Sequence, residues 1–362
     1  MDRRVFLQGL GLGLLLPGFA QAGRQHAFAQ VRPGTVLHFP YDHGGHAAFR
    51  TEWWYATGWL QDPDGQPLGF QLTFFRVATG IGADNPSAFA PRHLILAHAA
   101  VADPALGRLR QAERSARVGL GRAGWEEGRT GVWVDGWRFT QQGDSYLAEI
   151  AHQDFAYTLR LTPDGPPMLN GPGGYSQKAP DPLNASHYYS RPQLAVEGQL
   201  RLGRREQTVQ GRAWLDHEWS SEYLPASAQG WDWLGLNLDD GSALMVFRLR
   251  RPDGQPLWSA ATLRPKNGSP RSIPQTQIRW TPQRYWSSPR SQTRYPVAWH
   301  LTLENRHFEI QPLMDDQELD GRRSTGALYW EGAVRLLENG QTVGRGYLEL
   351  TGYGKALVMG AG

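Results

Sequence analysis

The sequence contains no cysteine, which excludes disulfide bonds, thiolate metal sites and cysteine nucleophiles. It also lacks a Gly-x-Ser-x-Gly elbow, a phosphate-binding loop and a dinucleotide fingerprint. The formal net charge is only +3 over 362 residues and no basic block occurs, so we expect no nucleic-acid partner. After the N-terminal leader no apolar run is long enough to span a bilayer, and we expect no stable membrane insertion.

The N-terminus has the pattern of a twin-arginine export signal. Arg3 and Arg4 precede an apolar run that ends at Leu16, and a small-residue cleavage motif ends at Ala22. The run is too short to cross a membrane, although an uncleaved anchor is the alternative. We therefore expect residues 1–22 to be removed and the mature protein to be located in the periplasm.

Glycine and proline are frequent, with 43 Gly and 25 Pro, which is typical of many short strands joined by turns. Residues 53–76 (WWYATGWLQDPDGQPLGFQLTFFR) align with residues 231–248 (WDWLGLNLDDGSALMVFR). Each segment is predicted to be a β-hairpin with an Asp-Gly turn. This internal repeat predicts an all-β chain of two related units, each an up-and-down antiparallel barrel or a sandwich.

We expect the two units to meet at residue 190. The first unit, residues 23–190, includes the tyrosine-rich connecting segment 166–190, which lacks strand character. Residues 191–362 then form the second unit, and GRAWLDHEWSSEYL, residues 211–224, falls within it.

GRAWLDHEWSSEYL contains three consecutive ionisable side chains, Asp216, His217 and Glu218. Because side chains alternate along a strand, Trp214, Asp216 and Glu218 share one face, whereas His217 and Trp219 share the other. The cluster is either a buried structural network between the units or an acid–base site. Neighbouring strand residues point apart and no metal-binding His spacing occurs, so we expect neither a metal nor a cofactor.

Longer motifs resemble a known family. FRTEWWYATGWL, GGYSQKAPDPLNASHYYS, GRAWLDHEWSSEYL and GWDWLGLNLDDGSALMVFRLR are similar to segments of the AttH/carotenoid 1,2-hydratase family of secreted proteins. The resemblance covers nearly the whole mature chain. It implies two lipocalin-like antiparallel β-barrels in tandem.

The resemblance also implies two kinds of function. The carotenoid hydratase branch adds water to the terminal double bond of an acyclic carotenoid without a cofactor, and related eukaryotic proteins hydrate prenyl groups or shape polyene cyclisations. The AttH branch, which this chain resembles more, often accompanies ABC-transporter permease genes. A permease is therefore a candidate partner.

Alkene hydration needs an acid to form a tertiary carbocation, a base to activate water, and aromatic faces beside the cation. Asp216 or Glu218 is the candidate acid if burial raises its pKa, and His217 is the candidate base. Both units would supply side chains to the walls of the substrate cleft. The candidate substrate-binding residues are Glu52, Trp53, Trp54, Tyr55, His98, Tyr175, Tyr188, Tyr189, Trp214, Trp219, Trp231 and Trp233.

Two function classes remain open, with a hydrolase as a lesser third. One is a hydratase, or a related lyase or isomerase, acting on a hydrophobic isoprenoid or polyketide-like molecule in an aromatic cleft. The other is a non-enzymatic lipid carrier that serves an ABC transporter. An enzyme would place a carboxylate or His with a strongly shifted pKa in the cavity. A carrier would have an open apolar cavity, with the Asp-His-Glu cluster hydrogen-bonded away from it.

Overall fold

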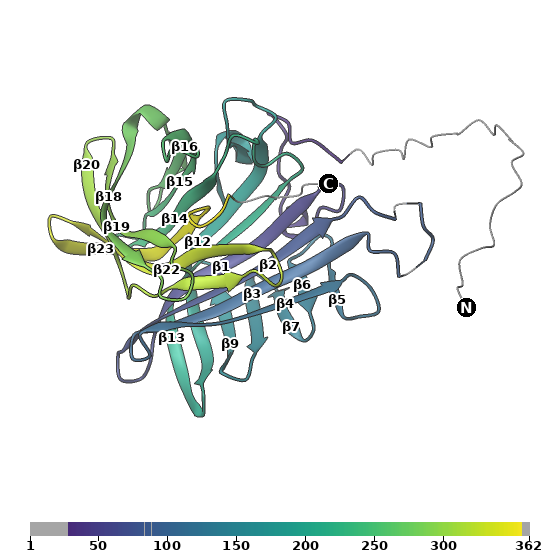
Figure 1. Cartoon of the computed structure of the whole chain (residues 1–362), viewed down its shortest axis with the longest axis horizontal. Helices are drawn as coiled ribbons and strands as arrows, with labels where there is room; N and C mark the ends of the chain where they lie inside the picture. Colours follow the sequence, from purple (N-terminus) through teal and green to yellow (C-terminus); the bar gives the residue numbers. More distant parts are fainter. Residues whose placement is uncertain (1–27, 83, 88, 357–362) are drawn as a thin grey trace, which may run out of the picture.

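A computed structural model describes residues 28–82, 84–87 and 89–356, so the expected leader, residues 1–22, lies outside the described residues. The regular secondary structure of the described residues consists almost entirely of strands, arranged in two antiparallel sheets (Figure 1). Three short 3-10 helices complete it: η1 (Tyr41–His43), η2 (Pro172–Gly174) and η3 (Gln275–Gln277). Within these residues, no helix combines the length and apolar character needed to cross a bilayer.

The first sheet has the strand order β4-β3-β2-β1-β13-β12-β9-β8-β7-β6-β5, with β10 and β11 also paired to β12. Its strands are β1 (Thr51–Gln61), β2 (Pro67–Ala78), β3 (His93–Asp103), β4 (Arg108–Arg117), β5 (Ala123–Trp125), β6 (Gly131–Val134), β7 (Trp137–Gln142), β8 (Ser145–Ala151), β9 (Phe155–Thr162), β10 (Met168–Leu169), β11 (Tyr175–Gln177), β12 (Ala185–Leu202) and β13 (Arg205–Ser220).

The second sheet has the order β17-β16-β15-β14-β23-β22-β20-β19-β18, with β21 paired to β22. Its strands are β14 (Gly230–Leu238), β15 (Ala243–Arg250), β16 (Pro256–Arg264), β17 (Arg271–Ile273), β18 (Ile278–Ser287), β19 (Arg294–Leu303), β20 (Arg306–Pro312), β21 (Glu318–Gly321), β22 (Ala327–Glu338) and β23 (Gln341–Thr351).

The two sheets repeat one topology. In each, the first strand pairs with the last, β1 with β13 and β14 with β23, and the predicted hairpins are β1–β2 and β14–β15. The first sheet is nearly closed, because Arg114 of β4 donates to the carbonyl of Asp135 beyond β6 and lies 4.9 Å from the ring centroid of Trp137. The prediction of two antiparallel all-β units is confirmed.

The sheets divide the chain later than expected. β12 runs from Ala185 to Leu202, across the expected boundary at 190, and segment 166–190 contains β10, β11 and the start of β12. The change of sheet falls between Ser220 and Gly230. The sequence GRAWLDHEWSSEYL therefore contributes the last strand of the first sheet, because the strand that precedes the second hairpin pairs with β1.

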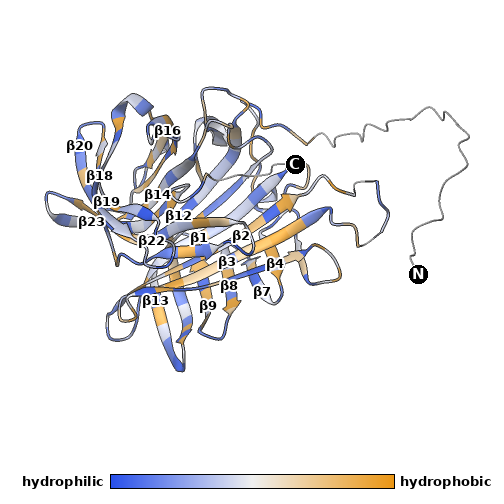
Figure 2. Cartoon of the chain, viewed as in Figure 1, coloured by the Kyte–Doolittle hydropathy of each residue, from blue (hydrophilic) through white to orange (hydrophobic). Residues whose placement is uncertain are grey.

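Each sheet encloses its own apolar core. Buried Leu, Val, Phe and Trp side chains fill the first barrel, and a separate set including Trp280, Trp299 and Trp330 fills the second. Figure 2 shows the alternation of hydrophobic and hydrophilic bands along β7, β8 and β9 that directs one face inward. A third cluster, containing Tyr55, Trp214 and Trp233, lies between the sheets. An apolar ligand is therefore expected between the barrels rather than inside either one.

Candidate active site between the sheets

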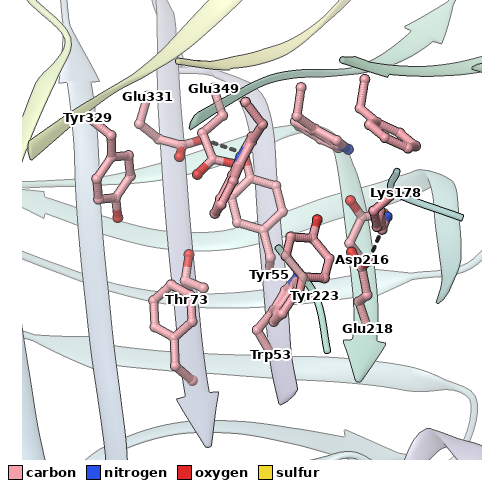
Figure 3. A pocket seen from close by; sticks show the side chains of 14 residues that line it. Trp53, Tyr55, Thr73, Lys178, Asp216, Glu218, Tyr223, Tyr329, Glu331 and Glu349 are labelled. Carbon is pink, nitrogen blue, oxygen red and sulfur yellow. Dashed lines mark hydrogen bonds and ion pairs between the residues drawn. The ribbon is translucent and has the colours of Figure 1, made fainter. Parts of the chain in front are cut away.

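A pocket opens where the two sheets face one another, and both contribute side chains to it (Figure 3). Trp53 and Tyr55 come from β1, and Asp216 and Glu218 come from β13. Strands β2, β14, β15, β22 and β23 supply other walls, and two loop residues complete the lining, Lys178 after β11 and Tyr223 between β13 and β14. Its free volume is about 50 Å³, room for a few water molecules or one end of a larger ligand.

Strand register places the first group of acids. Asp216 and Glu218 lie opposite Tyr55 and Trp53 in the β1–β13 ladder, so all four side chains project from the same face. The strand alternation inferred from the sequence is thus confirmed for this face. Trp231 and Trp233 of β14 face the same pocket from the second sheet.

Asp216 is buried and accepts three hydrogen bonds. The donors are the Tyr188 hydroxyl at 2.7 Å, the Ser190 hydroxyl at 2.5 Å and the Trp214 indole at 2.6 Å. Burial raises the pKa of Asp216 to about 7, against the opposing effect of these donors. Desolvation therefore outweighs three hydrogen bonds, and Asp216 changes its protonation state near neutral pH.

Glu218 forms a buried ion pair with Lys178, with 2.7 Å between Oε1 and Nζ, and also accepts from the Ser186 hydroxyl. The Lys178 ammonium lies 4.4 Å from the ring centroid of Phe247 and 4.8 Å from that of Tyr188. Burial raises the pKa of Glu218 and lowers that of Lys178, and their mutual attraction opposes both shifts. The cation–π contacts favour the charged lysine.

Glu331 and Glu349 form a second acidic group on the far side of the pocket (Figure 3). They are direct register partners on β22 and β23, so the buried Glu331 carboxyl group is held next to the half-buried Glu349 carboxyl group. Burial raises the pKa of Glu331 well above its ordinary value and the charge of Glu349 raises it further, whereas a hydrogen bond from the Tyr55 hydroxyl opposes the shift. Burial also raises the pKa of Glu349, to about 7.

Two adjacent carboxyl groups in one desolvated site cannot both ionise readily. At neutral pH the Glu331–Glu349 pair therefore retains at least one proton. The pocket thus holds a protonated acid beside aromatic rings, facing a carboxyl group that is paired with lysine.

His217 lies on the opposite face of β13, in the first barrel. Its Nε2 is 2.9 Å from a Glu52 oxygen, its Nδ1 is 3.1 Å from the Tyr189 hydroxyl, and its ring stacks on Trp54. Burial lowers the pKa of His217, an effect that Glu52 opposes. The structure separates this histidine from the two neighbouring acids, so it does not serve the pocket as a base.

The His217 network includes groups of the kind that bind metals. The ligating atoms of His46, Glu52 and His217 lie within 4.8 Å of one another, a juxtaposition that the sequence analysis did not foresee because the residues come from three segments. However, Glu52 is also paired with the fully buried Arg76 at 2.8 Å. This fixed cation repels a metal ion, so the arrangement fits a charge network better than a metal centre.

The other predicted ligand contacts divide into four groups. Trp53, Tyr55, Trp231 and Trp233 line the pocket, and Trp214 and Tyr188 support Asp216 from behind. The residues that lie instead on the opposite face, with His217, are Glu52, Trp54, Tyr189 and Trp219.

The fourth group contains the two remaining predicted residues, which also do not line the pocket. The Nδ1 atom of His98 is 2.5 Å from the hydroxyl of Tyr329, which lines the pocket. His98 therefore contacts the pocket wall from its outer side. Tyr175 packs with Val31 and Ala185 in a separate cluster.

Four residues that line the pocket were not predicted from the sequence: Lys178, Tyr223, Glu331 and Glu349. Lysine is rare in this arginine-rich chain, and Lys178 lies in one of the motifs quoted above. Glu331 and Glu349 are isolated acids within apolar strand sequences, LYWEGAV and GYLELTG. An isolated charge in a buried strand is the signal that could have identified them.

We expect Glu349 to contribute folding stability that falls as the pH rises from about 4.5 to about 7. Glu349 has a folded-state pKa of about 7 against an ordinary value of 4.5, so the folded state binds its proton more tightly. That stability is fully present below the ordinary pKa and is lost by pH 7, a difference on the order of 3 kcal/mol. Urea unfolding of the wild type and of Glu349→Gln at pH 5 and pH 8 isolates this contribution, because the stability at pH 5 minus that at pH 8 should be smaller in the variant. Equal differences in both proteins would contradict the assignment.

The fold and the pocket define a lipocalin-like two-barrel protein with an acidic, aromatic pocket between its barrels. A profile of the AttH-like family matches residues 30–353, and the chain belongs to that family. No protein in a search of those with curated descriptions matched significantly.

Solved structures agree with this assignment. An AttH protein from Nitrosomonas europaea is 49% identical, with a TM-score of 0.84 over 90% of this chain and 100% of that one. Kievitone hydratase from Nectria haematococca has a TM-score of 0.66 at 15% identity, over 91% and 97% of the two chains. CghA bound to Sch210972 has a TM-score of 0.50 at 12% identity, over 85% and 90%. The last two share the fold with this chain.

Proposed function

We propose that the protein binds the unsaturated end of a hydrophobic, isoprenoid or polyketide-like molecule between its barrels and catalyses cofactor-free hydration there, or a related lyase or isomerase step. One observation carries the proposal. Four carboxyl groups line an aromatic pocket together with one lysine; Asp216, Glu218 and Glu331 are buried and Glu349 is half-buried, so protonated and ionised acids coexist at neutral pH.

The Glu331–Glu349 pair is the proposed acid. One of its carboxyl groups transfers a proton to the less substituted alkene carbon, and the π electrons of the double bond form the new C–H bond. The adjacent carbon becomes a tertiary cation. Trp53, Trp231 and Trp233 present aromatic rings to the same pocket and stabilise positive charge.

The two carboxylates on the Lys178 side of the pocket, Glu218 and Asp216, are the proposed bases. Water attacks the cation through an oxygen lone pair and loses one proton to a carboxylate, for which Glu218 and Asp216 are placed. The proton returns to the Glu331–Glu349 pair through solvent in the pocket. The net reaction is alkene plus water to alcohol, with no oxidant or cofactor required. The sequence predicted Asp216 or Glu218 as the acid. In the proposed mechanism the acid is instead the Glu331–Glu349 pair on the opposite wall.

Two further observations support a catalytic site over a carrier. A carrier would have an open apolar cavity, whereas this pocket is narrow and holds ionisable groups with raised pKa values. A protein of the same fold is a hydratase by name, kievitone hydratase. We also propose, from the leader pattern, that the protein acts in the periplasm, and an ABC-transporter permease stays a predicted partner.

Incubation in water enriched in heavy oxygen tests the proposal. The mature protein is mixed separately with acyclic polyenes and with prenylated phenols, and the products are analysed by mass spectrometry. We expect a tertiary alcohol that contains one labelled oxygen. Substrates that bind but remain unchanged, or products without label, would contradict hydration.

A further inference from the structure

The face of the sheets that forms the acidic pocket continues into a second cavity. Along β22 and β23, Glu331 and Glu349 line the pocket, whereas Arg335 and Arg345 line an open groove of about 730 Å³. Between the two cavities, Trp214, Ala333 and Tyr347 pack together in the apolar cluster that joins the sheets. The seam between the barrels thus has an acidic end and a basic end.

Both barrels build the floor of the groove. The backbone N–H of Gln193 in β12 donates to Asn237 Oδ1 of β14 at 2.7 Å, and the side-chain amide of Gln193 donates to the carbonyl of Leu238. Trp59 of β1 donates its indole N–H to the carbonyl of Gly346 on β23 at 2.9 Å. These contacts between the sheets fix the floor, so the cationic side chains above it project from a rigid base.

The groove holds like charges in direct opposition. Arg335 and Arg345 are register partners on β22 and β23, and both guanidinium groups lie over the Trp59 ring, at 5.2 and 5.9 Å from its centroid. Like charges placed directly opposite on paired strands destabilise a sheet. Arg345 forms an ion pair with Asp239, with 3.5 Å between the guanidinium nitrogen and the carboxylate oxygen. Among the described residues, Arg335 has no carboxylate within ion-pair distance.

Two more cations line the same groove, Arg212 of β13 and Lys266 after β16. Neither has a carboxylate within ion-pair distance in the described part of the chain. The lining therefore contains four cations against two carboxylates, Asp164 and Asp239. Elsewhere, exposed arginines such as Arg122 and Arg306 make two-point contacts with a carboxylate.

We propose that this groove binds a phosphate-bearing ligand, separately from the chemistry of the acidic pocket. Guanidinium groups match the oxygens of a phosphate in two-point hydrogen bonds, and a doubly charged group would relieve the repulsion between Arg335 and Arg345. The phosphate can belong to a soluble ligand or to a lipid headgroup, since both present the same oxygens to the groove.

The test compares wild-type mature protein with Arg335→Gln and with the control Arg122→Gln, whose arginine does not line the groove. Calorimetric titration with inorganic pyrophosphate at low ionic strength measures the soluble ligand. Co-sedimentation with vesicles of phosphatidylcholine and phosphatidylglycerol measures the headgroup. We expect Arg335→Gln to weaken binding about ten- to a hundredfold, and Arg122→Gln to leave it unchanged.

Thermal unfolding separates binding from structure. Because Arg335→Gln removes a like-charge contact, we expect its melting temperature to equal or exceed that of the wild type. If Arg335→Gln weakens the binding of pyrophosphate, the ligand is a soluble phosphate compound. If it weakens the binding of vesicles alone, the ligand is a lipid headgroup. The proposal is overturned if neither probe binds at low ionic strength, or if Arg335→Gln binds as tightly as the wild type.

Discussion

Glu331→Gln is expected to lower turnover of the alkene substrate by about 10²- to 10⁴-fold and to leave substrate binding nearly unchanged. The amide is close to the acid in size, so the pocket keeps its shape, but it cannot donate a proton to carbon. The Tyr55 hydroxyl still has an oxygen to which it can donate. Single-turnover kinetics with a separate binding titration measure the two effects independently.

The matched control is Glu309→Gln, which removes an exposed carboxylate from the neighbouring strand β20. It should retain wild-type turnover. The pH profile gives a second check, because activity that needs a protonated acid falls as the pH rises through the pKa of the Glu331–Glu349 pair. Unchanged turnover in Glu331→Gln would remove this glutamate from the mechanism.

Lys178→Met is expected to lower the free energy of unfolding by about 3–5 kcal/mol at neutral pH, because it leaves the Glu218 carboxylate buried without its cation. The loss should shrink at low pH, where Glu218 takes up a proton and no longer carries an uncompensated charge. The pKa of Glu218 is already raised by burial and rises further without Lys178.

The double variant Lys178→Met/Glu218→Gln should recover most of this stability, since it contains no buried charge at the site. Urea unfolding of the wild type, both single variants and the double variant forms a complete cycle. A double variant as unstable as Lys178→Met would show that lysine packing against Phe247 and Tyr188, rather than the ion pair, stabilises the site.

Local patterns predicted the fold and one wall of the pocket correctly. The repeat predicted two hairpins and two antiparallel units, and strand alternation placed Asp216 and Glu218 together and His217 apart. These features depend on spacings within a single strand or hairpin. Such spacings are visible in a sequence because the side-chain period of a strand is two.

The features that the sequence did not predict depend on contacts between distant segments. Glu331 and Glu349 meet Asp216 only because β22 and β23 of the second sheet face β13 of the first. The boundary at 190 was misplaced for a related reason. The last strand of the first unit lies beside the next hairpin in sequence but pairs with β1 in space. Periodicity carries no information on such pairing.

Mass spectrometry of ligands that co-purify with the protein from its native host tests the central claim, that the seam between the barrels is a catalytic pocket for a hydrophobic molecule. We predict an isoprenoid or polyene present both intact and as a species heavier by one water molecule. In Glu331→Gln the heavier species should be absent. A bound phospholipid or acyl chain as the sole ligand, unaltered in wild type and variant alike, would contradict catalysis and leave a carrier.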